Sequence, residues 1–282
     1  MTLKISLIHF AVKYKQNRAN RSNLLDLIHK AAGRGAGLIL APEMALSGYG
    51  FNNRREIADH VEDESCVFLK AVAEIAARFA CHIAVGLALA DPRTDIFYNS
   101  LVVTGPAGIV CRYRKINAES RWACPGDPCQ NNIFTTRWGK IGVLICSDTY
   151  HGLIPRVTTL KGAGLLVVAA NWPPSGLDPV ELWQARAREN GIPIVVCNRT
   201  GRDREMDCRT AESCLIDAEG RVVTRHSSPD STIVETEIPL NENHRLEVRI
   251  RNQRLATRKP VLYHNCYRNL AAIPNLSSYF DL

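Results

Sequence analysis

Several common signatures are missing from this chain. Only 7% of its 282 residues are aromatic, and no apolar run reaches the ~18 residues of a membrane-spanning helix. No Gly-Lys-Ser/Thr phosphate loop occurs, so the sequence gives no sign of ATP binding. Residues 1–10 are too short for a signal peptide and lack a cleavage site, and we expect them to form a first strand.

Cysteine is present but sparse. The ten cysteines are far fewer than the ~8–10% of residues found in disulfide scaffolds, and most lie within apolar runs. This pattern predicts reduced thiols and a cytoplasmic location. Cys124 and Cys129 are the closest pair, but they have neither CxxC spacing nor histidines at zinc-like spacing, and no HExxH motif occurs. We therefore expect no metal site.

Positive charge is concentrated near the C-terminus. The formal net charge is +7, and residues 245–268 carry seven Lys and Arg against Glu247 alone. A nucleic-acid-binding arm is one interpretation. The segment has no aromatic residue before Tyr263 and no recognisable binding motif, so we expect a solvated or subunit-contacting tail.

Apolar runs alternate with helical patterns along the chain. Because two early strand–helix–strand units are followed by hairpin-like pairs, we expect an α/β fold with mixed sheets. One domain over residues 1–240 and a less regular basic tail over 241–282 are predicted. Strands are expected at 3–10, 37–42, 81–89, 99–104, 109–113, 141–146, 164–170, 193–198, 213–217, 221–225 and 232–238, and helices near 20–34, 64–80, 152–162 and 179–190.

Three apolar runs end on residues with reactive side chains. Cys146 follows the run 141–145, and a lone cysteine in such a place usually belongs to the core. Glu43 and Lys115 also come directly after predicted strands, where each alone would usually be a solvated charge. Because strand ends in α/β folds meet at one edge of the sheet, the three together predict a site with a nucleophile.

Longer motifs surround these three residues in a fixed order. They comprise residues 41–49 around the glutamate, 98–100 and 112–115 before the lysine, 142–148 around the cysteine, and 171–173, 185–190 and 198–201 downstream. From about residue 3 to 240 the chain resembles the nitrilase superfamily of carbon–nitrogen hydrolases, whose hallmark is a Glu-Lys-Cys triad. The resemblance implies a single-domain, four-layer α-β-β-α sandwich that forms dimers or larger assemblies.

The resemblance also implies roles for the site residues. Glu43 would be the general base and Cys146 the nucleophile, while Lys115 and the backbone N–H of Ser147 would stabilise an oxyanion. The ammonium of Lys115 would favour the thiolate of Cys146. Glu119 would be a second active-site glutamate, or alternatively a local i,i+4 ion-pair partner of Lys115. No metal or cofactor is needed for this chemistry.

The chain departs from the family pattern beside the nucleophile. Gly152 and Leu153 occupy positions that often hold Pro-Glu, which predicts an unusual substrate-facing wall. The aromatic residues expected to line the pocket are Tyr49, Tyr150 and Trp172. His151 is an alternative base for the cysteine, and we expect it to point elsewhere from the following turn.

The resemblance implies an amidase that cleaves a small carboxamide through a cysteine thioester and releases ammonia or an amine. An N-carbamoyl amide hydrolase would use the same triad. A nitrilase is less favoured because Cys-Ser-Asp replaces the Cys-Trp-Glu that nitrilases commonly carry. An acyltransferase and a non-catalytic binding protein are two further alternatives.

Overall fold

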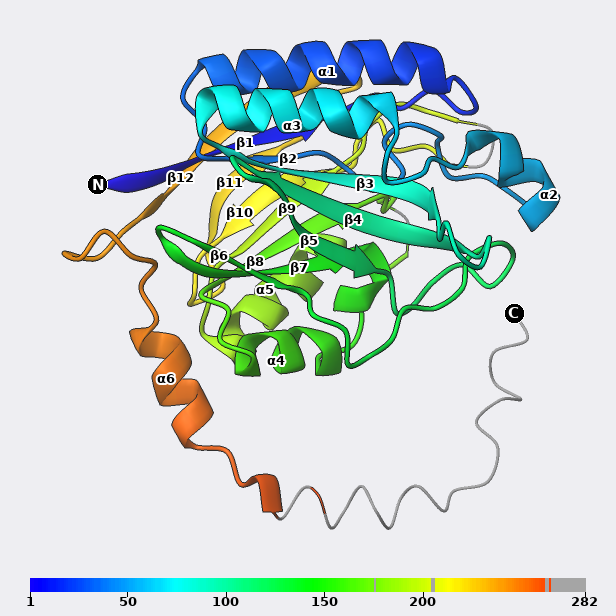
Figure 1. The fold of residues 1–282 in the computed structure, drawn as a ribbon. Helices are drawn as coiled ribbons and strands as arrows, with labels where there is room; N and C mark the ends of the chain where they lie inside the picture. Colours follow the sequence, from blue (N-terminus) through cyan, green and yellow to red (C-terminus); the bar gives the residue numbers. More distant parts are fainter. Residues whose placement is uncertain (175, 204–205, 262–263, 265–282) are drawn as a thin grey trace.

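The computed structural model describes residues 1–174, 176–203, 206–261 and 264 and contains two six-stranded β-sheets (Figure 1). The sheets stack face to face. Helices α1 and α3 lie over the outer face of one sheet, and α4 and α5 lie over the outer face of the other (Figure 1). The layers are therefore α-β-β-α, and the predicted fold class is confirmed.

The elements follow one another in alternating order along the chain. They are β1 (Thr2–His9), α1 (Asn17–Gly33), β2 (Leu38–Leu40), α2 (Arg54–Ile57), the short 3₁₀ helix η1 (Ala58–His60), α3 (Val67–Phe79), β3 (His82–Ala90), β4 (Phe97–Gly105), β5 (Gly108–Arg114), β6 (Ile133–Thr136), β7 (Gly139–Ile145), the 3₁₀ helix η2 (Cys146–Thr149), α4 (Leu153–Leu160), β8 (Leu165–Ala170), α5 (Pro179–Asn190), β9 (Ile194–Asn198), β10 (Ser213–Ile216), β11 (Val222–His226), β12 (Thr232–Pro239) and α6 (Arg249–Ala256).

Both sheets are mixed, and they share one pairing pattern. The first has the order β12-β1-β2-β3-β4-β5, in which β2 is parallel to β1 and β3 and the other pairs are antiparallel. The second has the order β6-β7-β8-β9-β10-β11, in which β8 is parallel to β7 and β9. In each sheet, helices connect the three parallel strands, as βαβ units require.

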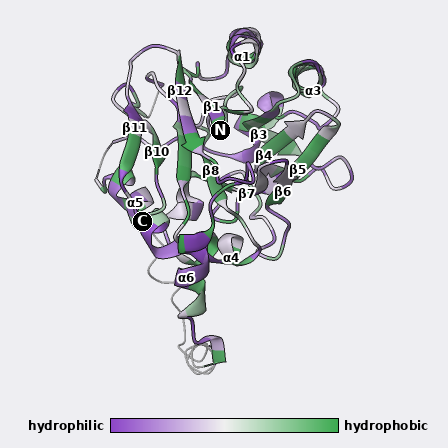
Figure 2. Cartoon of the chain, turned by 90° about the vertical axis from the view of Figure 1, so that its left-hand side faces the viewer, coloured by the Kyte–Doolittle hydropathy of each residue, from purple (hydrophilic) through white to green (hydrophobic). Residues whose placement is uncertain are grey.

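The core lies mainly between the two sheets. Strands β7, β8 and β9 are buried along almost their whole length, which explains their continuous apolar sequences. A second apolar cluster fills the space between the first sheet and helices α1 and α3. Figure 2 shows hydrophobic residues along the strands of both sheets. The strand ends that carry the predicted site residues therefore lie on a rigid frame.

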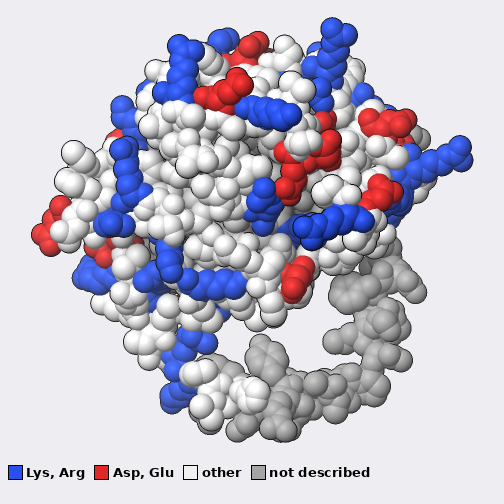
Figure 3. All heavy atoms as spheres, in the orientation of Figure 1, with Lys and Arg blue, Asp and Glu red and all other residues white. Residues whose placement is uncertain are grey.

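The tail is more regular than predicted. Instead of irregular chain, it contains the helix α6, none of whose residues is buried. The helix has no apolar stripe, so periodicity did not reveal it. Arg251 fixes α6 to the sandwich by donating hydrogen bonds to the carbonyls of Gly162 and Ala163. Lys and Arg side chains gather over α6 in Figure 3. Its contact with a second subunit stays a prediction, and most of 262–282 lies outside the described residues.

Two further properties bear on the sequence analysis. The nine cysteines within the described ranges are free thiols, and most are buried. No helix among the described residues is both long and apolar enough to cross a membrane.

Candidate active site

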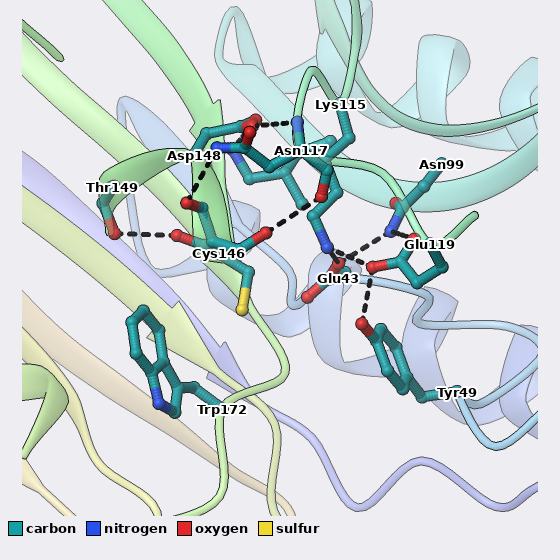
Figure 4. Close-up of polar contacts among 12 residues, drawn as sticks. Glu43, Tyr49, Asn99, Lys115, Asn117, Glu119, Cys146, Asp148, Thr149 and Trp172 are labelled. Carbon is teal, nitrogen blue, oxygen red and sulfur yellow. Dashed lines mark hydrogen bonds and ion pairs between the residues drawn. The ribbon is translucent and has the colours of Figure 1, made fainter. Parts of the chain in front are cut away.

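Three strand ends from two sheets meet at the site. Glu43 lies just beyond β2, and Lys115 follows β5, which runs in the same direction in the same sheet. Cys146 follows β7 of the opposite sheet. The structure brings the first two into direct contact, with Lys115 Nζ 2.7 Å from Glu43 Oε1. Figure 4 shows Cys146 next to Glu43 and Lys115.

The backbone around Glu43 is held against β3. Gly86 N–H donates to the carbonyl of Pro42, and Ala45 N–H donates to the carbonyl of Gly86. A Cβ atom at Gly86 would lie only 2.5 Å from the Cα of Glu43, so glycine is required for this approach. Met44 has a φ of 53°, which turns the chain out of the strand immediately after the glutamate.

Lys115 stands between two carboxylates. Its ammonium donates to Oε1 of Glu43 and to Oε1 of Glu119, and its side chain is only 1% exposed. Glu119 also accepts hydrogen bonds from the Tyr49 hydroxyl and from Asn99 Nδ2, the latter at 3.0 Å. Asn99 Nδ2 donates to Glu43 Oε1 as well, at 2.7 Å. Glu119 is thus an i,i+4 partner of Lys115 and also part of the buried cluster.

Burial and charge oppose each other in this cluster. Burial raises the pKa of Glu43, and Lys115 only partly counters this. Burial would also raise the pKa of Glu119, but the ammonium of Lys115 and the hydrogen bonds from Tyr49 and Asn99 together outweigh burial, and the pKa is lowered. Burial alone would lower the pKa of Lys115, yet the surrounding acidic groups together, Glu43 foremost, hold that pKa well above its ordinary value. Lys115 therefore stays protonated, while Glu43 accepts a proton more readily than an exposed glutamate does.

Cys146 is held in a left-handed backbone conformation at the start of η2. Its φ is 41°, a region that costs free energy for a non-glycine residue, and its side chain is almost completely buried. Burial and the charge of Glu43 raise the pKa of its thiol well above the usual value. Lys115 and a hydrogen bond from the Asn171 backbone lower this pKa, but by less. The expected thiolate is therefore disfavoured at rest, because burial outweighs the ammonium.

Hydrogen bonds tie the turn after Cys146 to the loop after Lys115. Asp148 is fully buried and accepts from Asn117 N–H at 2.8 Å and from the Tyr113 hydroxyl at 2.7 Å. Asn117 Nδ2 donates to the carbonyl of Ser147, and the Ser147 hydroxyl donates to the carbonyl of Asn117. This set of contacts fixes the nucleophile relative to the lysine across the two sheets.

Helix α5 holds η2 from another side. The Thr149 hydroxyl donates to the carbonyl of Cys146 at 2.7 Å, and Trp183 Nε1 donates to the same hydroxyl at 3.0 Å. Arg186 donates to the carbonyls of Thr149 and Tyr150. These contacts satisfy C-terminal carbonyls of the short helix and make its geometry rigid.

The three aromatic residues predicted for the pocket have different surroundings. In Figure 4 the sulfur of Cys146 points to the side on which Trp172 and Tyr49 lie. Tyr150 stacks on Trp172 with ring centroids 6.1 Å apart, but it is 46% exposed and so forms an outer part of this wall. His151 is exposed and packs against Tyr150. It also lines a groove beside α4.

Ser147 is the second residue of η2, so its backbone N–H belongs to the first turn, where amides have no partner within the helix. Lys115 uses two of its three N–H donors on carboxylates, which leaves one for a substrate oxygen. Within the described ranges, no group of three or more His, Cys, Asp or Glu side chains could hold a metal ion.

Sequence reasoning missed the supporting residues. Asn99 and Asp148 lie within motifs noted above, but no role was predicted for either, and Asn117 and Trp183 were not singled out. Their partners come from distant segments, so spacing along the chain carried no signal for these contacts.

The chain is similar to several known proteins. A family model described as carbon-nitrogen hydrolase matches residues 4–246. An omega-amidase of Xenopus laevis is 28% identical over 89% of this chain and 94% of its own length. An (R)-stereoselective amidase of Pseudomonas sp. is 30% identical over 78% and 80%, and a probable nitrilase of Schizosaccharomyces pombe is 29% identical over 86% and 90%. The crystal structure of Saccharomyces cerevisiae Nit3 has a similar fold, with a TM-score of 0.76, 20% identity and coverage of 91% and 94%.

Proposed function

The chain belongs to the carbon–nitrogen hydrolase family, as its motifs predicted, and we propose that it hydrolyses a small carboxamide through a thioester on Cys146. One observation carries this proposal. A protonated lysine lies between two buried carboxylates, beside a buried cysteine at the end of a strand. Such a group of residues provides a nucleophile, a base and an oxyanion donor without a cofactor.

The first half of the reaction forms the thioester. Glu43 takes the proton of the Cys146 thiol as the sulfur bonds to the amide carbon. Negative charge then develops on the carbonyl oxygen, where the third N–H of Lys115 and the backbone N–H of Ser147 stabilise it. Glu43 returns its proton to the nitrogen, the C–N bond breaks, and ammonia or an amine leaves.

The second half releases the acid. Water attacks the thioester carbon while Glu43 takes one of its protons, and the same two donors stabilise the second oxyanion. The C–S bond then breaks, the carboxylic acid departs, and the proton on Glu43 restores the thiol. The raised pKa of Glu43 suits a residue that alternates between base and acid.

The relatives and the pocket support an amide with a compact acyl group. Two of the relatives above are named as amidases. Cys146 is only 7% exposed, and its sulfur points to the side on which Trp172 lies (Figure 4). A substrate with a narrow acyl group therefore fits the approach to the sulfur. An N-carbamoyl compound has the same carbonyl chemistry. The relative named as a probable nitrilase makes nitriles the second candidate class.

Ammonia release from a panel of amides, ureido acids and nitriles tests this function. We expect the parent to act on a small amide and Cys146→Ala to be inactive. Cys214→Ala, which alters another fully buried free cysteine, should retain turnover. The proposal is rejected if the parent releases no ammonia from any compound, or if Cys146→Ala matches the parent.

A further inference from the structure

We propose that Asn99 is a positioning residue that holds Glu43 and Glu119 in register and leaves only Oε2 of Glu43 free to receive the thiol proton. This inference rests on the proposed function, because it assigns a role to a residue of the same site.

The geometry of Asn99 is unusual for a buried amide. It lies on β4, it is fully buried, and its Nδ2 donates to carboxylates from two separate segments. The distances are 2.7 Å to Glu43 Oε1 and 3.0 Å to Glu119 Oε2. Asn99 thus bridges the two acids, as Lys115 does with its ammonium.

The consequence concerns which oxygen of Glu43 can act. Oε1 already accepts from Asn99 and from Lys115 Nζ. Oε2 is buried and has no hydrogen-bond partner among the described residues. A buried carboxylate oxygen without a partner is costly, and such a cost is commonly tolerated at functional sites. The unpartnered oxygen is the one available to the thiol of Cys146.

Asn99 also affects the ionisation of the two glutamates. Two carboxylates that share one ammonium repel each other, and each makes the other harder to ionise. The charge of Glu119 raises the pKa of Glu43, whereas the hydrogen bond from Asn99 lowers it. The same amide also lowers the pKa of Glu119. Loss of the amide should therefore make Glu43 harder to ionise, which a purely structural asparagine would not do.

The test compares the parent with Asn99→Ala, with Asn99→Asp and with Asn132→Ala. Asn99→Asp keeps the shape but loses the donor, which covers the case in which the alanine variant does not fold. Asn132 is a matched control, because it is also a buried asparagine whose amide donates two hydrogen bonds. Its acceptors are the carbonyl of Val143 and the hydroxyl of Thr158, and neither is a carboxylate of the site. The first readout is the acidic limb of kcat/KM against pH. The second is the rate at which iodoacetamide alkylates Cys146, in which the C–S bond forms as iodide leaves and Glu43 takes the thiol proton; the product is followed by peptide mass spectrometry.

Both Asn99 variants should move the acidic limb to higher pH in both readouts. At a fixed pH on the limb, the rate should fall about ten-fold or more, the size expected for losing a hydrogen bond to a charged group. Asn99→Asp should move it further than Asn99→Ala, because it adds a third carboxylate. Asn132→Ala should lower the melting temperature and leave the limb in place.

Coincidence of the limbs of both Asn99 variants with that of the parent would overturn the inference. Alkylation needs no substrate, so it still decides the role of Asn99 if no amide is hydrolysed. In that case the proposed function fails on the ammonia assay, and the inference about Asn99 is judged separately.

Discussion

At the scale of single residues, the chemistry of the site depends on whether one proton lies on the thiol of Cys146 or on the carboxylate of Glu43. Burial and Glu43 keep the thiol of Cys146 protonated, although an ammonium lies nearby. In the proposed reaction, Cys146 is therefore activated only as the substrate reacts, when Glu43 takes the proton. This arrangement protects a reactive cysteine from unwanted modification, since the thiolate is the reactive form.

Replacing the base should reveal this balance. In Glu43→Gln the negative charge that raises the pKa of Cys146 is gone while Lys115 remains, so the pKa of the thiol should fall. Thiolate absorbance, measured across pH against the Glu43→Gln/Cys146→Ala double variant, should therefore appear at lower pH than in the parent. Turnover should fall by about 10²–10⁴ because general-base catalysis is lost. A variant with normal turnover would contradict the role of Glu43.

Glu119→Gln should act in the opposite direction from the Asn99 variants. The charge of Glu119 raises the pKa of Glu43, so its removal should lower that pKa. The acidic limb of kcat/KM should then move to lower pH. If Glu119 acts in catalysis, kcat should also fall about 100-fold. A shifted limb with an unchanged kcat would indicate that Glu119 is only an ion-pair partner of Lys115.

The sequence predicted Glu43, Lys115 and Cys146 as one site but did not predict their environment. Glu43, Lys115 and Cys146 were predicted because each ends an apolar run within a recognisable motif. The raised pKa of Cys146 depends on complete burial, and the role of Asn99 depends on two partners that are 56 and 20 positions away. Neither property is written in local spacing.

At the scale of elements, the catalytic geometry depends on close approach between neighbouring segments. Two residues outside the short helix η2 hold it in place. Asn117 donates to Asp148 of η2, and Trp183 donates to Thr149 of η2 from another side. The turn that carries Glu43 lies directly against Gly86 of β3. Small backbone shifts in either place would separate the base from the nucleophile.

Gly86→Ala tests this contact. The new Cβ would lie 2.5 Å from Glu43 Cα and 2.6 Å from the carbonyl oxygen of Pro42, both backbone atoms, so the turn must move. We expect a loss of about 1–3 kcal/mol in the free energy of unfolding. Turnover should drop about 100-fold, as for a misplaced catalytic group. Gly33→Ala is the control, since nothing lies within 4 Å of the added atom, and it should not destabilise the protein. Full activity in Gly86→Ala would contradict the account.

Long apolar elements were predictable, whereas the edge strand β6 and the helix α6 were not. The predicted helix at 179–190 has the observed bounds of α5. The strand β6 has only four residues at the edge of its sheet, and α6 buries none of its residues. Both lack the long apolar periodicity on which prediction depends. Pairing with β7 holds β6, and the hydrogen bonds of Arg251 hold α6.

At the scale of the whole molecule, two sheets with the same strand pattern supply one site between them. The first sheet contributes Glu43, the proposed base, and Lys115, and the second contributes Cys146, the proposed nucleophile. The strand–helix–strand units and hairpin-like pairs predicted mixed sheets, and the resemblance to a family predicted the layered sandwich. The sequence did not reveal the shared pattern of the sheets, because pairing partners are set by tertiary contacts. The specificity of the site also depends on how the sheets pack.

A histidine at the junction of the sheets makes that packing sensitive to acid. His9 ends β1 of the first sheet, and its Nδ1 lies 2.9 Å from the hydroxyl of Ser213 on β10 of the second. Burial, with a smaller contribution from His226, lowers the pKa of His9 from 6.5 to about 4. The neutral ring is therefore the form that the folded state accepts.

The pKa of His9 is lower in the folded state than in the unfolded state. The contribution of its neutral ring to the free energy of unfolding is therefore fully present above pH 6.5. It should be lost as the pH falls from 6.5 to about 4. A shift of this size corresponds to about 3 kcal/mol. Melting curves of His9→Gln should show a smaller loss between these pH values than the parent, whereas the exposed His29→Gln should follow the parent. Parallel curves for His9→Gln and the parent would argue against this role.

The central claim is that Cys146 carries the acyl group of an amide substrate. The most direct measurement is mass spectrometry of the protein quenched during turnover of an amide that releases ammonia. The account predicts an added mass equal to the acyl group on the peptide that contains Cys146, and no such adduct in Cys146→Ala. Turnover that persists in Cys146→Ala, or an acyl group on another cysteine, would contradict it.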